Sequence, residues 1–125
     1  MKEWFLDAII ENIPSMIFVK EAEELRFTLF NRAGEELIGA TRDLLIGKTD
    51  FDFVPHEQAV AFTAKDREVL QQQGVVDVWE EPIDSPDKGR RILHTRKVAV
   101  RDERGVARYL LGISEDITER KRIER

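Results

Sequence analysis

The C-terminal residues of this chain change from the pattern of a β-strand to that of a solvated helix within a few positions. Between residues 106 and 117 mostly apolar side chains recur at alternate positions, namely Ala107, Tyr109, Leu111, Ile113 and Ile117. Such alternation predicts a strand with one buried face. From residue 118 onward strong helix formers follow with almost no apolar side chains. Because such a helix has too little apolar surface to fold alone, we expect it to connect this domain to another part of a protein.

Asp116 lies where the two patterns meet. Its short acceptor side chain is suited to cap the first free N–H groups of the helix, and Glu119, three residues later, would complete a box-like arrangement. We expect Asp116, Ile117 and Thr118 to form the relay from the last strand to the exit helix, with an ion pair from Asp116 to a basic residue of the core. The alternative is that Asp116 is only a cap, with no part in such a relay.

Composition excludes several classes of function. A chain of 125 residues with 42% apolar and 36% charged side chains suits one soluble domain with one core. The net charge of −5 gives no general attraction to nucleic acid or anionic membranes, so we expect neither nucleic-acid binding nor membrane insertion. The lack of cysteine removes disulfides, thiolate catalysis and zinc–thiolate sites, in agreement with a cytoplasmic location.

Hydrophobic periodicity and turn residues predict eight elements along the chain. The predicted helices are 2–12, 31–38 and 56–73, with a short turn capped by Asp50, and the predicted strands are 15–20, 25–30, 75–83, 90–101 and 106–117. Asn31 is suited to cap the second helix and Gly39 to end it. The simplest packing is an α+β fold, a five-stranded antiparallel sheet with helices on one face.

The first helix places Trp4, Phe5 and Ile9 near one face. Two readings stay open for this face. It packs on its own domain, or it is a dimerisation element, because two large aromatic side chains are unusual on a short outer helix.

The longest predicted helix has an inner stripe of Ala59, Phe62, Val69 and Leu70. Asp66 falls on the same stripe, and a carboxylate that faces a sheet needs a partner. We expect a structural ion pair or a cap on neighbouring backbone; the alternative is a ligand contact.

The sequence argues against catalysis. Its two histidines, His56 and His94, show no metal-ligand spacing, and no glycine-rich phosphate loop is present. We expect His56 to be exposed at a helix start, and we leave open whether His94 points into the domain or onto the outer sheet face. We therefore predict no catalytic residues and no metal site.

Four segments in order resemble the PAS family. Residues 30–39 resemble its first short helix, 46–55 its middle loop, 100–105 its last hairpin turn, and 112–121 (Gly-Ile-Ser-Glu-Asp-Ile-Thr-Glu-Arg-Lys) its closing strand and signalling helix. The resemblance covers nearly the whole chain. It implies strand order 2-1-5-4-3 and a division into an N-terminal helix (1–13), a PAS domain (14–118) and the start of a signalling helix (119–125).

PAS domains that resemble this chain often hold a small ligand between the sheet and the short helices. The candidate lining residues are Phe18, Phe30, Phe51, Phe53, Phe62 and Trp79, with His94 and Arg96 as polar points. An aromatic set of this kind is more often plain core than pocket wall, so we favour core over cavity. The cofactor is unknown. The resemblance disfavours two cofactors. Haem-binding PAS domains usually use a histidine on the long helix, and residues 57–73 hold none. Covalent flavin chemistry in the light-sensing subfamily needs a cysteine, and the chain has none.

The resemblance implies a sensory or regulatory module of a bacterial signal-transduction protein, either a histidine kinase or a cyclic-di-nucleotide enzyme. We expect a homodimer that responds to a small molecule or a partner and acts on a downstream output domain of the same chain. The alternatives are a ligand-free dimerisation or interaction domain and a small enzyme.

Overall fold

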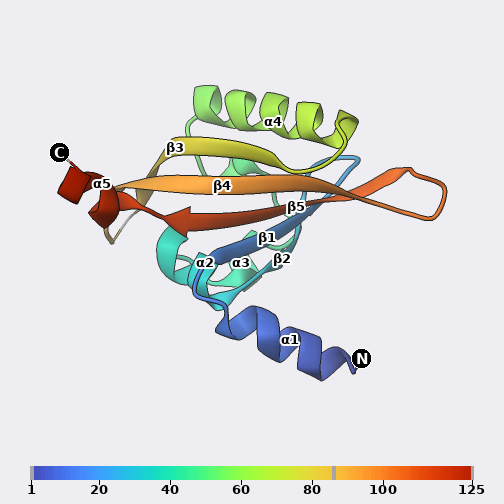
Figure 1. Ribbon diagram of the computed structural model, residues 1–125, viewed down its shortest axis with the longest axis horizontal. Helices are drawn as coiled ribbons and strands as arrows, with labels where there is room; N and C mark the ends of the chain where they lie inside the picture. The colour runs from blue at the N-terminus through green and yellow to red at the C-terminus, as the bar shows by residue number, and fades with distance from the viewer. Residues whose placement is uncertain (1, 86, 125) are drawn as a thin grey trace.

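The computed structural model describes residues 2–85 and 87–124. Its elements in chain order are α1 (Glu3–Asn12), β1 (Met16–Glu21), β2 (Phe27–Phe30), α2 (Arg32–Ile38), α3 (Arg42–Leu45), the 3-10 turn η1 (Asp50–Asp52), α4 (His56–Gln71), β3 (Val76–Ser85), β4 (Gly89–Arg101), β5 (Ala107–Asp116) and α5 (Thr118–Glu124) (Figure 1). The element order is the one that periodicity predicts, with boundaries shifted by a few residues and with α3 added where the sequence predicted no helix.

The strands form one antiparallel sheet in the order β2-β1-β5-β4-β3, which confirms the predicted α+β fold and strand order. Helix α4 packs against β4 and β5, α2 packs against β1, and α3 packs against β2. Helix α1 projects away from this body, and α5 leaves at the far end of β5 (Figure 1). None of the helices in the two described ranges combines the length and the apolarity that a membrane crossing requires.

The buried face of β5 is the opposite of the predicted one. Leu110, Gly112 and Ser114 face the helices and are buried, whereas Tyr109 and Ile113 are 45% and 38% exposed on the outer face. The Phe18 ring lies so close to Gly112 that a Cβ atom there would collide with it. The inner face is therefore built from small and polar side chains at this point, and the apolar alternation belongs to the outer face.

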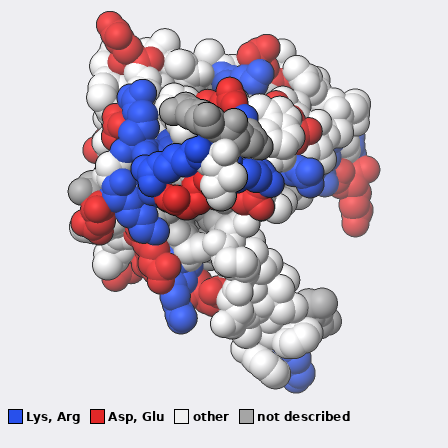
Figure 2. All heavy atoms as spheres, turned by 60° about the vertical axis from the view of Figure 1, so that its left-hand side comes forward, with Lys and Arg blue, Asp and Glu red and all other residues white. Residues whose placement is uncertain are grey.

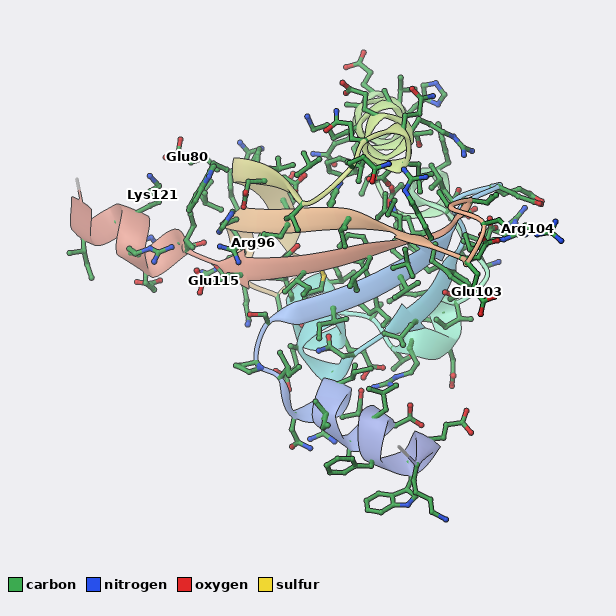
Figure 3. All side chains as sticks on the ribbon, turned by 45° about the vertical axis from the view of Figure 1, so that its right-hand side comes forward. Glu80, Arg96, Glu103, Arg104, Glu115 and Lys121 are labelled. Carbon is green, nitrogen blue, oxygen red and sulfur yellow. The ribbon has the colours of Figure 1, made fainter. Side chains whose placement is uncertain are left out.

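The outer face of the sheet is left uncovered by the helices of the chain. Figure 3 looks toward this face, on which Arg96 of β4 and Glu115 of β5 lie. Its apolar part consists of exposed side chains from β4 and β5, including Val100, Tyr109 and Ile113.

Helix α1 contributes no buried residue to the domain. Trp4 is 68% exposed and touches Phe5, with ring centroids 5.7 Å apart. In the view of Figure 2 the helix is an arm that is mostly uncharged along its length. Its described contacts with the body are made near its C-terminal end, where Glu11 pairs with Arg42.

Two of the predicted helix ends are confirmed and one is wrong. The Asn31 side chain accepts from Gly34 N–H at the start of α2, and Gly39 ends α2 in the left-handed conformation. Asp50 does not cap η1. Its carboxylate pairs with Lys20, while Asp52 accepts from the Thr49 backbone N–H at 3.0 Å.

Asn31 is fully buried and joins three segments of the chain. Its Oδ1 accepts from Ile17 N–H at 2.9 Å and from Gly34 N–H at 3.1 Å. Its Nδ2 donates to the carbonyl oxygens of Ile10 and Ser15, both at 3.0 Å. The side chain thus fixes the end of α1, the start of β1 and the start of α2 relative to one another.

Replacing Asn31 with alanine is expected to lower the free energy of unfolding by about 2–4 kcal/mol, because a cap worth ~1 kcal/mol is lost and buried backbone groups lose partners at about 1–3 kcal/mol. Urea denaturation followed by circular dichroism measures this. The control is Asn12→Ala, since the exposed Asn12 bonds only to Ala8 of its own helix. Equal losses for the two variants would contradict the structural role of Asn31.

Candidate functional site

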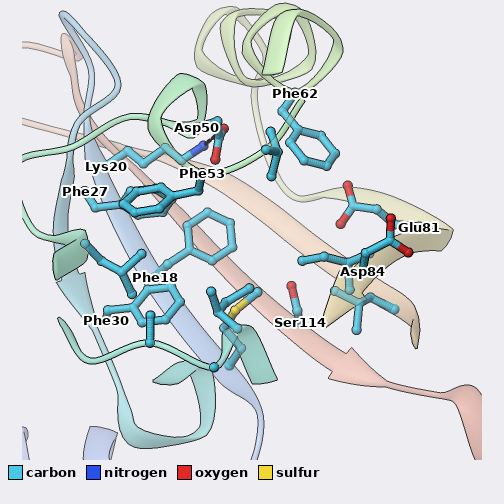
Figure 4. A pocket seen from close by; sticks show the side chains of 18 of the residues that line it. Phe18, Lys20, Phe27, Phe30, Asp50, Phe53, Phe62, Glu81, Asp84 and Ser114 are labelled. Carbon is cyan, nitrogen blue, oxygen red and sulfur yellow. Dashed lines mark hydrogen bonds and ion pairs between the residues drawn. The ribbon is translucent and has the colours of Figure 1, made fainter. Parts of the chain in front are cut away.

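A cavity of about 280 Å³ lies between the inner face of the sheet and the layer of α2, η1 and α4 (Figure 4). Most of its wall is apolar. The lining residues are Met16, Phe18, Lys20, Phe27, Phe30, Ile38, Gly39, Ala40, Leu45, Asp50, Phe53, Val54, Phe62, Glu81, Ile83, Asp84, Leu93, Lys97 and Ser114.

Four of the eight predicted lining residues border this cavity, namely Phe18, Phe30, Phe53 and Phe62. Phe27, which sequence reasoning missed, lies among them and packs edge-on against Phe18, Phe30 and Phe53. Phe18, Phe27 and Phe30 are buried, so the same rings are both core and cavity wall. From the sequence we favoured core over cavity for these rings, and in the structure they are both.

The other four predicted residues lie outside the cavity. Phe51 is 47% exposed on η1 and contacts His56 instead. Trp79, His94 and Arg96 lie on the outer sheet face, because alternation along β4 turns its even-numbered side chains outward. The Trp79 and His94 rings are stacked with centroids 3.5 Å apart, and His94 Nε2 lies 2.7 Å from an Asp77 oxygen.

One end of the cavity is closed by a buried cluster of charges. Lys20 Nζ of β1 donates to Asp66 Oδ2 of α4 at 2.6 Å and to Asp50 Oδ2 of η1 at 2.7 Å. Lys97 Nζ of β4 donates to Asp66 Oδ1 at 2.8 Å. Asp66 is fully buried, so the structural ion pair expected for it is present. The sequence held a signal for these partners. Lys20 and Lys97 each lie two residues after an inward-facing side chain, Phe18 and Thr95, and therefore point to the same side of the sheet.

The cluster keeps Lys20 charged. Burial by itself would lower the pKa of Lys20, but the negative charges of Asp66 and Asp50 outweigh that effect and hold the pKa above the usual lysine value. Two lysines and two aspartates balance within the cluster.

The other end of the cavity carries a chain of hydroxyl and carboxylate groups. Thr95 Oγ1 donates to Glu81 Oε1 at 2.9 Å, and Thr95 Oγ1 lies 2.7 Å from Ser114 Oγ. Thr95 and Ser114 are buried on β4 and β5. Glu81 and Ser114, the two outer members of this hydrogen-bonded row, border the cavity (Figure 4).

The exit junction has the ion pair expected for Asp116. Asp116 Oδ2 accepts from Arg91 Nε at 2.8 Å, and Asp116 Oδ1 accepts from the backbone N–H and the hydroxyl of Thr118. Thr118 Oγ1 in turn accepts from Ile92 N–H at 2.8 Å. Partial burial would raise the pKa of Asp116, but the bonds from Thr118 and Arg91 outweigh it and lower the pKa below the usual aspartate range. Glu119 does not complete a box; its carboxylate bonds to Arg122.

A β-bulge in β3 lies between the cavity and this junction. The register against β4 shifts between Val78 and Glu81, and Glu80 has a left-handed φ of 55°. Glu80 forms an ion pair with Lys121 of α5, and Figure 3 shows the two side chains near each other. The next residue, Glu81, borders the cavity.

A family model for the PAS fold matches residues 10–122. The chain belongs to the PAS family. Among curated proteins it is 38% identical over 115 residues to the uncharacterized protein y4lL of Sinorhizobium fredii, covering 90% of this chain and 14% of that protein. It is 31% identical over 120 residues to the aerobic respiration control sensor protein ArcB of Escherichia coli, covering 96% of this chain and 15% of ArcB. This PAS chain thus spans only a small part of each relative.

Solved structures agree on the fold. The VqmA dimer of Vibrio cholerae superposes with a TM-score of 0.81 at 24% identity, covering 96% of this chain and 53% of that one. A structure of VqmA bound to DPO gives a TM-score of 0.77 at 25% identity, covering 90% and 57%. The PAS domain of a Colwellia psychrerythraea protein gives 0.77 at 17% identity, covering 93% and 97%.

Substituting Asp66 with asparagine is expected to destabilise the domain by about 3–5 kcal/mol, because two buried lysines lose their shared counter-charge. Urea denaturation at neutral pH checks this. The control is Asp84→Asn, whose side chain is 68% exposed beside Arg90. That variant is expected to lose less than about 1 kcal/mol, and an equal loss in both would contradict the role of the cluster.

The same cluster predicts a pH dependence. The contribution of Lys20 is complete below the ordinary lysine pKa of about 10.4 and is lost as the pH rises through its higher folded value. Stability lost as the pH rises above about 10.4 should therefore be smaller in Asp66→Asn than in the parent. Parallel losses in both proteins would assign the alkaline transition to other groups.

Proposed function

We propose that this PAS domain is a sensory module of a signal-transduction protein, and that a small molecule in the cavity is its signal. The cavity carries the proposal, because a core that served only as scaffold would be filled at the usual packing density. Similarity to the sensor ArcB and to a structure of VqmA bound to DPO supports it. Similarity to the methanogenesis regulatory histidine kinase FilI of Methanothrix harundinacea, at 29% identity, favours a kinase as the parent protein.

Two contacts support a route from the cavity to α5. Adjacent residues of β3 point to opposite sides, Glu81 to the cavity and Glu80 to Lys121. A ligand that pulls on Glu81 therefore moves the backbone that holds Glu80. Asp116 ties the start of α5 to Arg91 of β4, so a shift of β3 against β4 reaches the exit helix through both contacts. In this proposal residues 119–125 begin the signalling helix.

The sensing route is tested by filling the cavity. Val54 borders the cavity, whereas Val60 is exposed on α4 outside it. Val54→Trp should change amide hydrogen exchange of residues 118–123 by about threefold or more, as an occupied cavity would, and Val60→Trp should not. Hydrogen exchange read by NMR measures this and reports whether each variant is folded. Equal exchange in the two variants would sink the route.

Asp116→Ala supplies the second arm of that experiment. The fold should survive, and exchange of residues 118–123 should rise about fivefold, in line with a cap worth about 1 kcal/mol. In the double variant with Val54→Trp the added effect of the filled cavity should vanish, because the tie to β4 is gone. Persistence of that effect would leave Asp116 as a cap only. Glu115→Ala, a neighbouring exposed carboxylate paired with Arg120, is the matched control.

We propose further that the domain works as a homodimer, with α1 and the outer sheet face as the contact. The apolar side chains of α1 (Trp4, Phe5, Leu6 and Ile9) are all exposed, and the outer face of β4 and β5 adds a second apolar surface. A second copy covers both without any other partner. In this proposal residues 1–13 are the dimerisation element, and nucleic acid is no partner of this acidic domain.

The Trp4→Glu/Phe5→Glu variant should therefore sediment as a monomer where the parent sediments as a dimer. A charge placed on the apolar face of α1 costs more in a buried contact than in solvent. Val60→Glu, an equally drastic change on exposed α4, should leave the mass of the parent unchanged. If the α1 variant keeps that mass too, this helix is not the interface. A dimer without any cavity response would favour the ligand-free interaction domain.

A further inference from the structure

The two ends of the cavity offer different groups to a ligand. At the Lys20 end both lysines already face carboxylates, with Lys20 bonded to two of them. The charges of the cluster balance, and an anionic ligand there would have to compete with aspartates held at 2.6–2.8 Å. This end therefore offers a carboxylate or phosphate little net attraction.

The Glu81 end presents acceptors, as a count of protons shows. A glutamate carboxylate only accepts, so the single hydroxyl proton of Thr95 goes to Glu81 Oε1. The bond of 2.7 Å between Thr95 and Ser114 then has to use the hydroxyl proton of Ser114. Ser114 Oγ, which borders the cavity and is 2% exposed, is left with lone pairs for a ligand.

Glu81 and Asp84 are the carboxylates at this end, and Asp84 is paired with Arg90. Asp84, three residues from Glu81 on the same strand, borders the cavity at a more exposed position. Figure 4 shows the side chains of Glu81 and Asp84 on one side of the cavity and the rings of Phe18, Phe27 and Phe30 on the other. A molecule that bridges the two sides needs a flat apolar body and hydrogen-bond donors on one edge.

Size narrows the choice. A volume of about 280 Å³ lies just under the usual range of about 300–1,000 Å³ for ligand sites. The body is therefore a single ring or a pair of fused rings.

We propose that the cavity selects small planar molecules, uncharged or cationic, that donate N–H or O–H hydrogen bonds from one edge to Glu81 and Ser114. This inference rests on the proposed function, in that it names the chemical class of the molecule sensed. Planar acids of the same shape are rejected, because Glu81 repels them and the lysines are already paired.

Four probes of one shape separate the classes. Benzamide and benzamidine carry N–H donors, whereas methyl benzoate and benzoate carry none. In NMR titrations of the whole chain, the two donors should bind at least about tenfold more tightly than the other two, the size of effect that buried acceptors left unpaired produce. Shift changes should concentrate on residues around Glu81 and Ser114.

Variants then locate the selection. In Glu81→Gln the preference for benzamide over methyl benzoate should fall to about threefold or less, since the neutral amide offers a donor as well as an acceptor. Benzamidine should lose most, because its counter-charge is gone. Ser114→Ala should weaken both donors without helping benzoate. Glu115→Gln, on the outer face beside Arg120, should bind all four probes like the parent.

The outcomes keep the two proposals apart. Equal binding of the four probes, or tighter binding of benzoate, in a chain where Val54→Trp abolishes all binding would overturn the donor selection and leave the sensory cavity standing. A preference that survives Glu81→Gln unchanged would overturn the role of Glu81. No binding of any probe to the parent would overturn the donor selection and the small-molecule cavity together.

Discussion

The contact between Asp66 and its two lysines sets the space between α4 and the sheet. Long polar side chains from β1 and β4 reach up to a fully buried carboxylate of α4, so ionic bridges join this helix to the strands. Replacing such a buried cluster with apolar residues is often neutral or stabilising. Stability alone therefore does not account for the cluster. The cluster also forms part of the cavity wall, through Lys20, Asp50 and Lys97.

The sequence predicted the ends of α2 and the ion pair of Asp66, but it did not predict which face of β5 is buried. Asn31 and Gly39 were recognisable because caps depend on a single side chain or on freedom at φ, and Asp66 because a carboxylate on an apolar stripe needs a partner. The alternation in β5 marked two different faces but gave no sign of which one the helices cover. Here the apolar face is outside, since Gly112 must admit the Phe18 ring and Ser114 joins a buried hydroxyl chain.

The bulge in β3 explains why alternation did not predict Glu81 as a cavity residue. Regular alternation after Val78, which faces inward opposite Thr95, would turn Glu81 outward. One extra residue at Glu80, in the left-handed conformation, shifts the phase so that Glu81 faces the cavity, on the same side of the sheet as Val78. Nothing in the composition of this strand marks the shift, because Glu80 is not a glycine. The acceptor end of the cavity and the contact of β3 with α5 both depend on it.

The pairing of Met16 with Ser114 has a geometric consequence for the two terminal helices. It brings the first residue of β1 beside the end of β5, so α1 and α5 both depart from one end of the two central strands of the sheet. We expect a change in the twist of the β1–β5 pair to alter the angle between α1 and α5, because each helix continues from one strand of this pair.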